Sequence, residues 1–316
     1  MSATTNLKVL SQREDRYVEG HRLCAGCAEP IIARQIMMST DKPVVVANAT
    51  GCFEVSSTIY PFTSWNVPWI HSAFENAPAT ISGVEAAYLA LKRKGAITDE
   101  MRFIAFGGDG ASYDIGLQSL SGAIERGHHF LYVCLNNEAY MNTGIQRSGA
   151  TSRGAQTTTC PAGTCVPGKK EFPKNLTKII IAHELPYAAQ ASPHAFKDLI
   201  EKSAKGLEAN GPSFINVIAP CPRGWRFDSA KTIEMAKLAV DTCMWPLYEF
   251  ELGKWRLTAD SKRIADGSKP KLPVSEWLKS QGRFSHLSAE KWAYVAEEIQ
   301  VNIDKQWEEL LRLCKA

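Results

Sequence analysis

The strongest structural signal in the chain is the stretch RFIAFGGDGASYDIGLQSLSGAIERGHHFLYVCLNN, residues 102–137. Two short apolar runs within it, 102–106 and 130–135, are each followed by a turn signal, as buried strands are. The segment between them, 112–125, predicts a helix. A strand, a helix and a second strand in this order predict two parallel strands joined by a helical crossover.

The same alternation extends through the first 220 residues of the chain. Further strands are predicted at 43–48, 178–182 and 213–219, and further helices at 76–95 and 195–209. This order implies an α/β fold with a doubly wound, mostly parallel sheet. Ligands of such sheets bind at the carboxyl ends of the strands. The long polar segment 138–174 leaves one of these ends, and loops of that length inside a compact domain are usually functional.

The sequence changes character after residue 222, which predicts a division into a domain at 1–222 and a C-terminal arm at 223–316. Six of the eight tryptophans lie in this arm. Its last part, 288–314, has apolar residues at helical spacing: Trp292, Val295, Ile299, Ile303, Trp307 and Leu310. Two interpretations stay open, since this stripe could pack on the core of the chain or against another subunit.

Length and composition restrict the class of protein. With 316 residues and 45% hydrophobic residues, the chain can bury an enzyme-sized core. Its net charge of +3 does not indicate a nucleic-acid or membrane surface. No apolar run approaches the length of about 18 residues that a membrane span needs, and the first residues lack the apolar segment of a signal peptide. We therefore expect a cytoplasmic protein.

Polar residues follow two neighbouring strands of the predicted sheet. Gly108-Asp109-Gly110 comes directly after the strand at 102–106, and Asn137 follows the strand at 130–135. Carboxylate and amide oxygens are ligands that Mg²⁺ prefers, while the glycines and the amino end of the helix at 112–125 suit an anion. The pattern predicts a site for Mg²⁺ and a diphosphate; the alternative is an ordinary glycine turn followed by an Asn-rich strand end.

The nine cysteines do not suggest a disulfide framework, because their number is odd and no export signal is present. Cys24, Cys27, Cys52 and Cys221 each lie in a loop-like context. Four such thiolates can hold a [4Fe–4S] cluster or a structural zinc ion. A diphosphate site at the same sheet edge favours the cluster. The other pair in a polar segment, Cys160 and Cys165, could be further ligands, a redox-sensitive dithiol or neither.

The GDG and NN elements together resemble the signature of thiamine-diphosphate enzymes. Over residues 18–260 the chain resembles the beta subunit of 2-oxoacid:ferredoxin oxidoreductases, and most closely the pyruvate type. The matching stretches are GHRLCAGCAEP (20–30), ATGCFEVSSTIYPFTSW (49–65), HSAFENAPATISGVEAAY (71–88), FGGDGASYDIGLQSLSGAIERGH (106–128), YMNTGIQRSGAT (140–151) and PCPRGWRFD (220–228).

The resemblance implies roles for particular residues. Asp109, Asn137 and the Ala139 carbonyl would hold Mg²⁺, and the four cysteines at 24, 27, 52 and 221 would hold the [4Fe–4S] cluster nearest the thiamine. The residues that it implies at the cofactor are Gly51, Cys52, Gly108, Asp109, Gly110, Ala111, Asn137, Ala139, Asn142 and Thr143. Asn142 and His71 would be catalytic, with Glu75 and Asn76 near the cofactor. For His71 a hydrogen-bonded core histidine is the alternative.

The implied activity is the oxidative decarboxylation of a small 2-oxoacid, with electrons passing through the cluster to ferredoxin. Pyruvate, with coenzyme A as acyl acceptor, is the expected substrate, and oxalate without coenzyme A is an alternative. The resemblance implies an alpha subunit that supplies the thiamine-activating glutamate, and a further subunit with ferredoxin-like clusters. The chain alone should then be inactive.

Two other classes of function stay open. One is a non-redox thiamine-diphosphate enzyme whose four cysteines bind zinc. The other is a noncatalytic scaffold subunit, against which the Asp109 and Asn137 pair speaks because packing does not require it.

Overall fold

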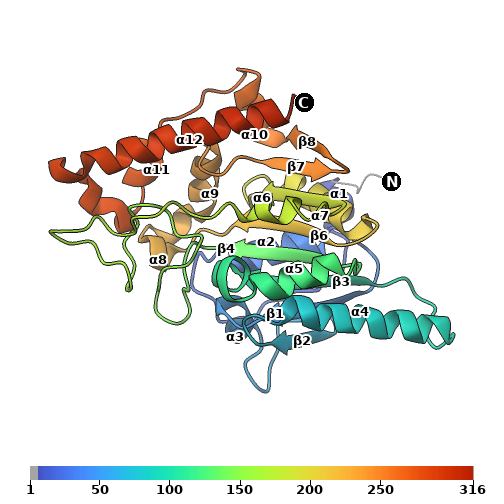
Figure 1. Ribbon diagram of the computed structural model, residues 1–316. Helices are drawn as coiled ribbons and strands as arrows, with labels where there is room; N and C mark the ends of the chain where they lie inside the picture. The colour runs from blue at the N-terminus through green and yellow to red at the C-terminus, as the bar shows by residue number, and fades with distance from the viewer. Residues whose placement is uncertain (1–5, 316) are drawn as a thin grey trace.

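The computed structural model describes residues 6–315 and contains a single sheet of eight strands (Figure 1). The strand order is β2-β1-β3-β4-β6-β5-β7-β8. The strands are β1 (Val44–Ala49), β2 (Trp69–Ser72), β3 (Arg102–Gly108), β4 (Leu131–Asn136), β5 (Tyr187–Ala191), β6 (Ser213–Ile218), β7 (Tyr248–Glu251) and β8 (Lys254–Leu257). The first six are parallel, and β7 and β8 join antiparallel at one edge. The predicted α/β, mostly parallel sheet is confirmed.

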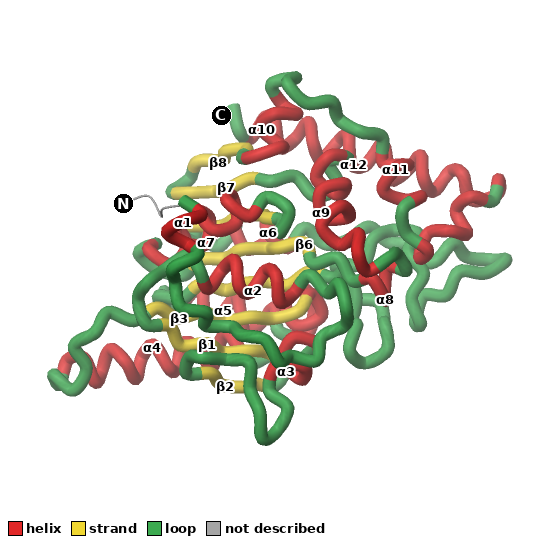
Figure 2. The backbone as a smooth tube through the Cα atoms, turned by 180° about the vertical axis from the view of Figure 1, so that it is seen from behind, coloured by secondary structure: helices red, strands yellow, loops and turns green. Residues whose placement is uncertain are grey.

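Helices cover both faces of this sheet. Figure 1 shows α4 (Ala77–Arg93) and α5 (Leu117–Glu125) on one face, and Figure 2, seen from behind, shows α2 (Glu29–Met37) and α7 (Phe196–Glu208) on the other. Because strand side chains alternate, Phe103 and Ala105 of β3 join the core under α4 and α5, and Ile104 joins the core under α2 and α7. Because both faces of this central strand are buried, its sequence is a continuous apolar run.

The crossover from β3 to β4 contains one irregularity. The predicted helix at 112–125 is a π-helical turn, Gly110–Ile115, followed by α5. Gly116 separates the two, and a Cβ atom at this position would lie 2.4 Å from the carbonyl oxygen of Ala111. The close approach of two backbone segments therefore requires glycine here.

The prediction of a strand at 178–182 is wrong. This apolar run lies in the helix α6 (Leu176–Ile181), which Asn175 caps by accepting a hydrogen bond from the Lys178 amide at 3.1 Å. Short apolar runs do not distinguish a buried helix from a strand by periodicity. The strand at this place in the sheet is β5, whose sequence YAAQA has no β-branched residue and gave no signal.

The C-terminal segment packs on the chain itself. Its strands β7 and β8 extend the sheet, and the helix α12 (Ala293–Leu313) lies at the same edge (Figure 1). The apolar stripe of α12 is buried in the core, including Val295, Ile299 and Trp307. The inner face of α12 therefore belongs to this chain, and contact of its outer face with another subunit stays a prediction.

The remaining helices are short and connect these layers. They are α1 (Leu7–Leu10), α3 (Cys52–Ser57), α8 (Pro222–Trp225), α9 (Thr232–Asp241), α10 (Ala259–Ala265) and α11 (Val274–Lys279), with 3₁₀ turns at Ser229–Lys231, Gly282–Ser288 and Glu290–Trp292. Within residues 6–315, no helix combines the length and apolar character needed to span a bilayer.

Candidate active site

A pocket lies at the carboxyl ends of β1, β3 and β4, where the fold predicts ligand binding. Nearly all of the predicted cofactor residues line it. From the predicted set these are Gly51, Cys52, Gly108, Gly110, Ala111, Asn137, Ala139, Asn142 and Thr143. The turns that follow three adjacent strands thus converge, although they are far apart in the sequence.

Asp109 is fully buried beside this pocket, next to Gly108 and Gly110 that line it. Its Oδ2 atom accepts a hydrogen bond from the hydroxyl of Ser148, while Oδ1 has no partner of normal hydrogen-bond geometry among the described residues. Burial raises the pKa of the carboxyl to about 8, although the Ser148 hydroxyl and nearby backbone amides lower it. A buried carboxylate with a free oxygen requires a proton or a cation. These properties fit a metal ligand.

Asn137 is the second predicted metal ligand and is held on two sides. Its Nδ2 donates to Oε1 of Glu29 at 3.1 Å, and its backbone carbonyl accepts from the indole Nε1 of Trp225 at 2.8 Å. Its Oδ1 accepts only a long hydrogen bond, 3.4 Å, from the Ala139 amide. The amide oxygen therefore stays available on the side of the pocket.

Two glycines leave the space that an anionic group would need. At both Gly51 and Gly108, a Cβ atom would meet no other atom within 4 Å. Both residues line the pocket, so any other side chain would project into this open space. Gly110 is different, because its Cβ would lie 2.3 Å from the ring of Tyr140. The first two glycines keep the pocket open, and the third permits close packing of its wall.

All four predicted cluster cysteines lie close enough to take part in mutual electrostatic effects. Burial, together with the charges of Glu29, Cys221 and Cys52, raises the pKa of the Cys27 thiol. The pKa of Cys52 is raised by burial, then by Glu29, Cys221 and Cys24, and is lowered by a hydrogen bond from Asn142. Burial also raises the pKa of Cys221 to about 11, against a hydrogen bond from the Gly224 amide at 3.3 Å.

The loop of Cys24 and Cys27 is brought to Cys221 by a specific contact. A Cβ atom at Gly26 would lie 2.2 Å from the carbonyl oxygen of Ser229, and Gly26 has a left-handed φ of +75°. The hydroxyl of Thr232 also donates to the Gly26 carbonyl. The loop therefore packs against the segment that follows α8, the short helix that begins after Cys221.

The four thiols share one neighbourhood but do not form a finished metal site. In the part of the chain that the structure describes, no group of three His, Cys, Asp or Glu side chains is arranged to hold an ion. All nine cysteines are free. Metal binding deprotonates cysteine thiols and is coupled to folding, so four neighbouring thiols need not adopt ligand geometry before a metal binds.

Glu29 connects the loop of Cys24 and Cys27 with Asn137, one of the predicted Mg²⁺ ligands. The sequence gave little indication of this role. Glu29 is the first residue of α2, is buried, and contacts both Asn137 and the Cys27 thiol. Burial raises its pKa to about 7. The only sequence signal was a glutamate two positions after the CxxC motif.

His71, Glu75 and Asn76 do not line the pocket. His71 is on the edge strand β2, with its side chain 47% exposed, so it is not a core histidine. Its Nε2 hydrogen-bonds the Thr50 hydroxyl at 2.6 Å, and Thr50 lines the pocket. Glu75 and Asn76 precede α4 and do not line the pocket, whereas Phe74 does. A catalytic role of His71 stays a prediction.

Cys160 and Cys165 lie in the long loop after β4. A bridge between Ala162 and Pro167 closes the tip of this loop, where Cys165 is exposed and Cys160 is half-buried. The structure gives neither thiol a contact with the other four cysteines, and the roles of this pair stay open.

Comparisons with known proteins agree on the chemistry of this region. The sequence profile of the thiamine pyrophosphate enzyme C-terminal TPP binding domain matches residues 49–217. Pyruvate synthase subunit PorB of Thermotoga maritima is 50% identical over 98% of this chain and 96% of that protein. The PorB subunit of Methanocaldococcus jannaschii is 49% identical over 93% of this chain and 96% of that protein.

Two further proteins extend the comparison. The ketoisovalerate oxidoreductase subunit VorB of Pyrococcus abyssi is 40% identical over 96% of this chain and 94% of that protein. A solved structure of the 2-oxoglutarate:ferredoxin oxidoreductase from Magnetococcus marinus, with 2-oxoglutarate, coenzyme A and succinyl-CoA bound, is similar with a TM-score of 0.55. It is 20% identical and covers 71% of this chain and 79% of that chain, so this likeness concerns the fold alone.

Proposed function

The chain belongs to the beta-subunit family of the 2-oxoacid:ferredoxin oxidoreductases, and from this premise we propose that it is the thiamine-diphosphate-binding subunit of an enzyme that oxidises pyruvate. The observation that carries the proposal is the free, buried oxygen of Asp109 beside the open space at Gly51 and Gly108. Such a site suits a cation that bridges a carboxylate and a diphosphate.

Each side chain has a distinct part in the proposed site. Asp109, Asn137 and the Ala139 carbonyl would hold Mg²⁺, and Gly51 and Gly108 would let the backbone approach the diphosphate. Thiamine diphosphate supplies the electron sink that decarboxylation of a 2-oxoacid requires. Asn142 and Thr143 line the same pocket and would orient the substrate beside it.

The binding of thiamine diphosphate tests the site directly. Equilibrium dialysis with Mg²⁺ should detect binding to the complex formed with the partner subunits, and Asp109→Ala should abolish it. Asp266→Ala is the matched control, because Asp266 follows α10 at the surface and lies outside the site. Equal binding by both variants would contradict the proposal.

We further propose that Cys24, Cys27, Cys52 and Cys221 hold a [4Fe–4S] cluster next to this pocket. The hydrogen bond from Asn142 to Cys52 supports it, because Asn142 lines the cofactor pocket. A cluster there would accept electrons at short range from the bound cofactor. Zinc at the same thiolates is the alternative, and the iron and acid-labile sulfide content of the anaerobically purified chain separates the two.

Pyruvate is the proposed substrate because the relative from Thermotoga maritima, a pyruvate synthase subunit, is 50% identical to this chain over nearly its whole length. VorB at 40% identity makes a branched 2-oxoacid the nearest competitor, and oxalate is a further alternative. Carbon dioxide release from each acid, with and without coenzyme A, identifies the substrate: pyruvate should depend on coenzyme A, and oxalate should not.

The proposed reaction needs other chains. An alpha subunit would supply the thiamine-activating glutamate, and a further subunit with ferredoxin-like clusters would pass electrons to ferredoxin. The name PorB denotes one subunit of a larger enzyme, which supports this arrangement. We propose a cytoplasmic location, where the nine free cysteines would stay reduced.

A further inference from the structure

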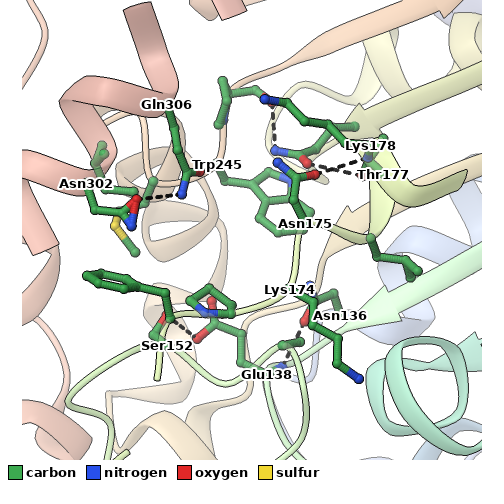
Figure 3. Close-up of a pocket in the computed structure, with 18 of the residues that line it drawn as sticks. Asn136, Glu138, Ser152, Lys174, Asn175, Thr177, Lys178, Trp245, Asn302 and Gln306 are labelled. Carbon is green, nitrogen blue, oxygen red and sulfur yellow. Dashed lines mark hydrogen bonds between the residues drawn. The ribbon is translucent and has the colours of Figure 1, made fainter. Parts of the chain in front are cut away.

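The turn that carries the proposed Mg²⁺ ligands has two sides. Asn137 and Ala139 line the cofactor pocket, whereas Asn136 and Glu138 line a second cavity on the opposite side. Figure 3 shows this second cavity, whose far wall includes Asn302 and Gln306 of α12. Alternate residues of one short turn therefore face the cofactor site and the C-terminal segment.

Glu138 has a backbone conformation that requires support. Its φ is +63°, in the left-handed region that residues other than glycine rarely adopt. Its amide donates to Asn136 Oδ1 at 3.0 Å, and its carbonyl accepts from the Thr151 hydroxyl at 2.6 Å. The side chain of Ser152 donates to Glu138 Oε2 at 2.9 Å (Figure 3). This conformation places Asn137 and Ala139 on the same side.

The remaining support for Glu138 is a buried ion pair with an arginine of the C-terminal segment. Arg283, in the 3₁₀ turn Gly282–Ser288, pairs with Glu138 through Nη1 and Oε2 at 2.8 Å, and both side chains are buried. The Arg283 guanidinium lies 4.2 Å from the centre of the Trp225 ring and 4.9 Å from that of Phe284. A buried ion pair of this kind is costly to break, because the remaining charge has no solvent to stabilise it.

Trp225 forms a second connection between Arg283 and the turn at Asn137. Its indole Nε1 donates to the Asn137 carbonyl at 2.8 Å, while its ring contacts Arg283 and, edge to face, Trp277. It also ends the helix α8, which begins after Cys221. The carbonyl of Asn137 and the side chain of Glu138 are thus both fixed by C-terminal residues.

We infer that Arg283 is a positioning residue for the Mg²⁺–diphosphate site, which it serves by holding Glu138 so that Asn137 and Ala139 face the pocket together. This inference rests on the proposed function. It assigns a part of the cofactor site to the C-terminal segment, although Arg283 does not line the pocket itself.

The test measures the dissociation constant of thiamine diphosphate and its dependence on Mg²⁺, in the complex with its partner subunits. Arg283→Met should raise that constant about 10- to 100-fold, as loss of an outer-shell partner of a metal ligand does, and should raise the Mg²⁺ concentration needed for half-saturation. Arg283→Lys keeps the charge and should recover part of the loss. A purely structural role would lower thermal stability without shifting the Mg²⁺ dependence.

Two controls separate the ion pair from its surroundings. Arg102→Met removes an arginine that pairs with Glu208 at the amino end of β3, the opposite end of this strand from the pocket, and should leave the dissociation constant unchanged. Glu138→Gly relieves the left-handed strain but removes the carboxylate, so it should weaken binding as Glu138→Gln does. If Glu138→Gly binds like the natural protein, the ion pair has no role and the inference is overturned.

The outcomes distinguish this inference from the proposed function. Absence of thiamine diphosphate binding in the unmodified complex would refute the proposed function and the inference together. Normal binding by the unmodified complex and by Arg283→Met would refute the inference alone. Should Arg283→Met fail to fold, Glu138→Gln and Arg283→Lys change less volume, and unchanged binding in both would overturn the inference.

Discussion

Asp109 shows how much of the site a single residue determines. Ser148 occupies one carboxylate oxygen, and the other has no hydrogen-bond partner among the described residues, so that this second oxygen is available to a cation. The GDG motif predicted Asp109, but nothing predicted Ser148, because it enters from the long loop at a distance of 39 residues in the sequence. Contacts of this kind depend on how a loop folds, and no local pattern specifies that.

Removal of the Ser148 hydroxyl should weaken the proposed metal site. Ser148→Ala leaves both oxygens of Asp109 without a hydroxyl donor, and we expect the affinity for thiamine diphosphate with Mg²⁺ to fall roughly tenfold. Ser203→Ala is the control, because that buried hydroxyl donates to a carbonyl within α7. Isothermal titration of both variants tests this prediction, and an unchanged affinity in Ser148→Ala would contradict it.

The elements were predictable where the residue pattern allowed a single interpretation. The unit β3–α5–β4 and the helix α4 follow the predicted ranges closely, since buried strands and amphipathic helices have strong patterns there. The helix α6 was predicted as a strand and the strand β5 was missed, because an isoleucine-rich run fits either structure and only the Asn175 cap favours the helix. The sequence did not predict the antiparallel strands β7 and β8, since their pairing depends on tertiary contacts with β5.

The break between the π-helical turn and α5 depends on the glycine at position 116. Gly116→Ala would place a Cβ atom 2.4 Å from the Ala111 carbonyl, and we expect it to destabilise the fold by about 1–3 kcal/mol. Gly83→Ala, in the exposed face of α4 with no atom within 4 Å of the added Cβ, should stabilise it by about 0.5–1 kcal/mol. Urea unfolding measures both, and equal effects would refute the packing argument.

At the scale of the whole molecule, one buried carboxylate joins the C-terminal strands to the rest of the sheet. Glu249 of β7 accepts from Lys205 of α7 at 2.8 Å and from the Tyr187 hydroxyl at 3.0 Å. Burial alone would raise the pKa of Glu249, but the hydrogen bonds from Lys205 and Tyr187 and the neighbouring charges outweigh burial and lower it. The deprotonated form therefore stabilises the fold.

The lowered pKa of Glu249 determines how the stability of the fold depends on pH. The contribution of Glu249 is complete above its unfolded pKa of about 4.3 and is lost as the pH falls through the lower pKa of the folded state. Glu249→Gln should therefore destabilise the protein at neutral pH, and the difference from the natural protein should shrink in acid. Denaturation midpoints across pH measure this, with the exposed Glu297→Gln as control. A difference that stays constant with pH would exclude the mechanism.

The fold as a whole brings together the residues of two proposed sites that lie far apart in the sequence. The proposed Mg²⁺ ligands follow β3 and β4, whereas the four cysteines lie at positions 24, 27, 52 and 221. The sequence predicted that the turns after β3 and β4 would meet, because parallel strands bring their carboxyl ends to one edge. The connection between the sites through Glu29, Trp225 and Arg283 could not be predicted, since each contact depends on the packed tertiary structure.

We propose that oxidation of a 2-oxoacid reduces a cluster beside the thiamine-diphosphate pocket. Visible absorption and EPR spectra of the anaerobically purified complex, recorded before and after addition of pyruvate, test it most directly. We predict a brown protein whose iron–sulfur absorption bleaches with pyruvate, together with an EPR signal of reduced cluster. A colourless, zinc-containing protein whose spectra do not change with pyruvate would contradict the account.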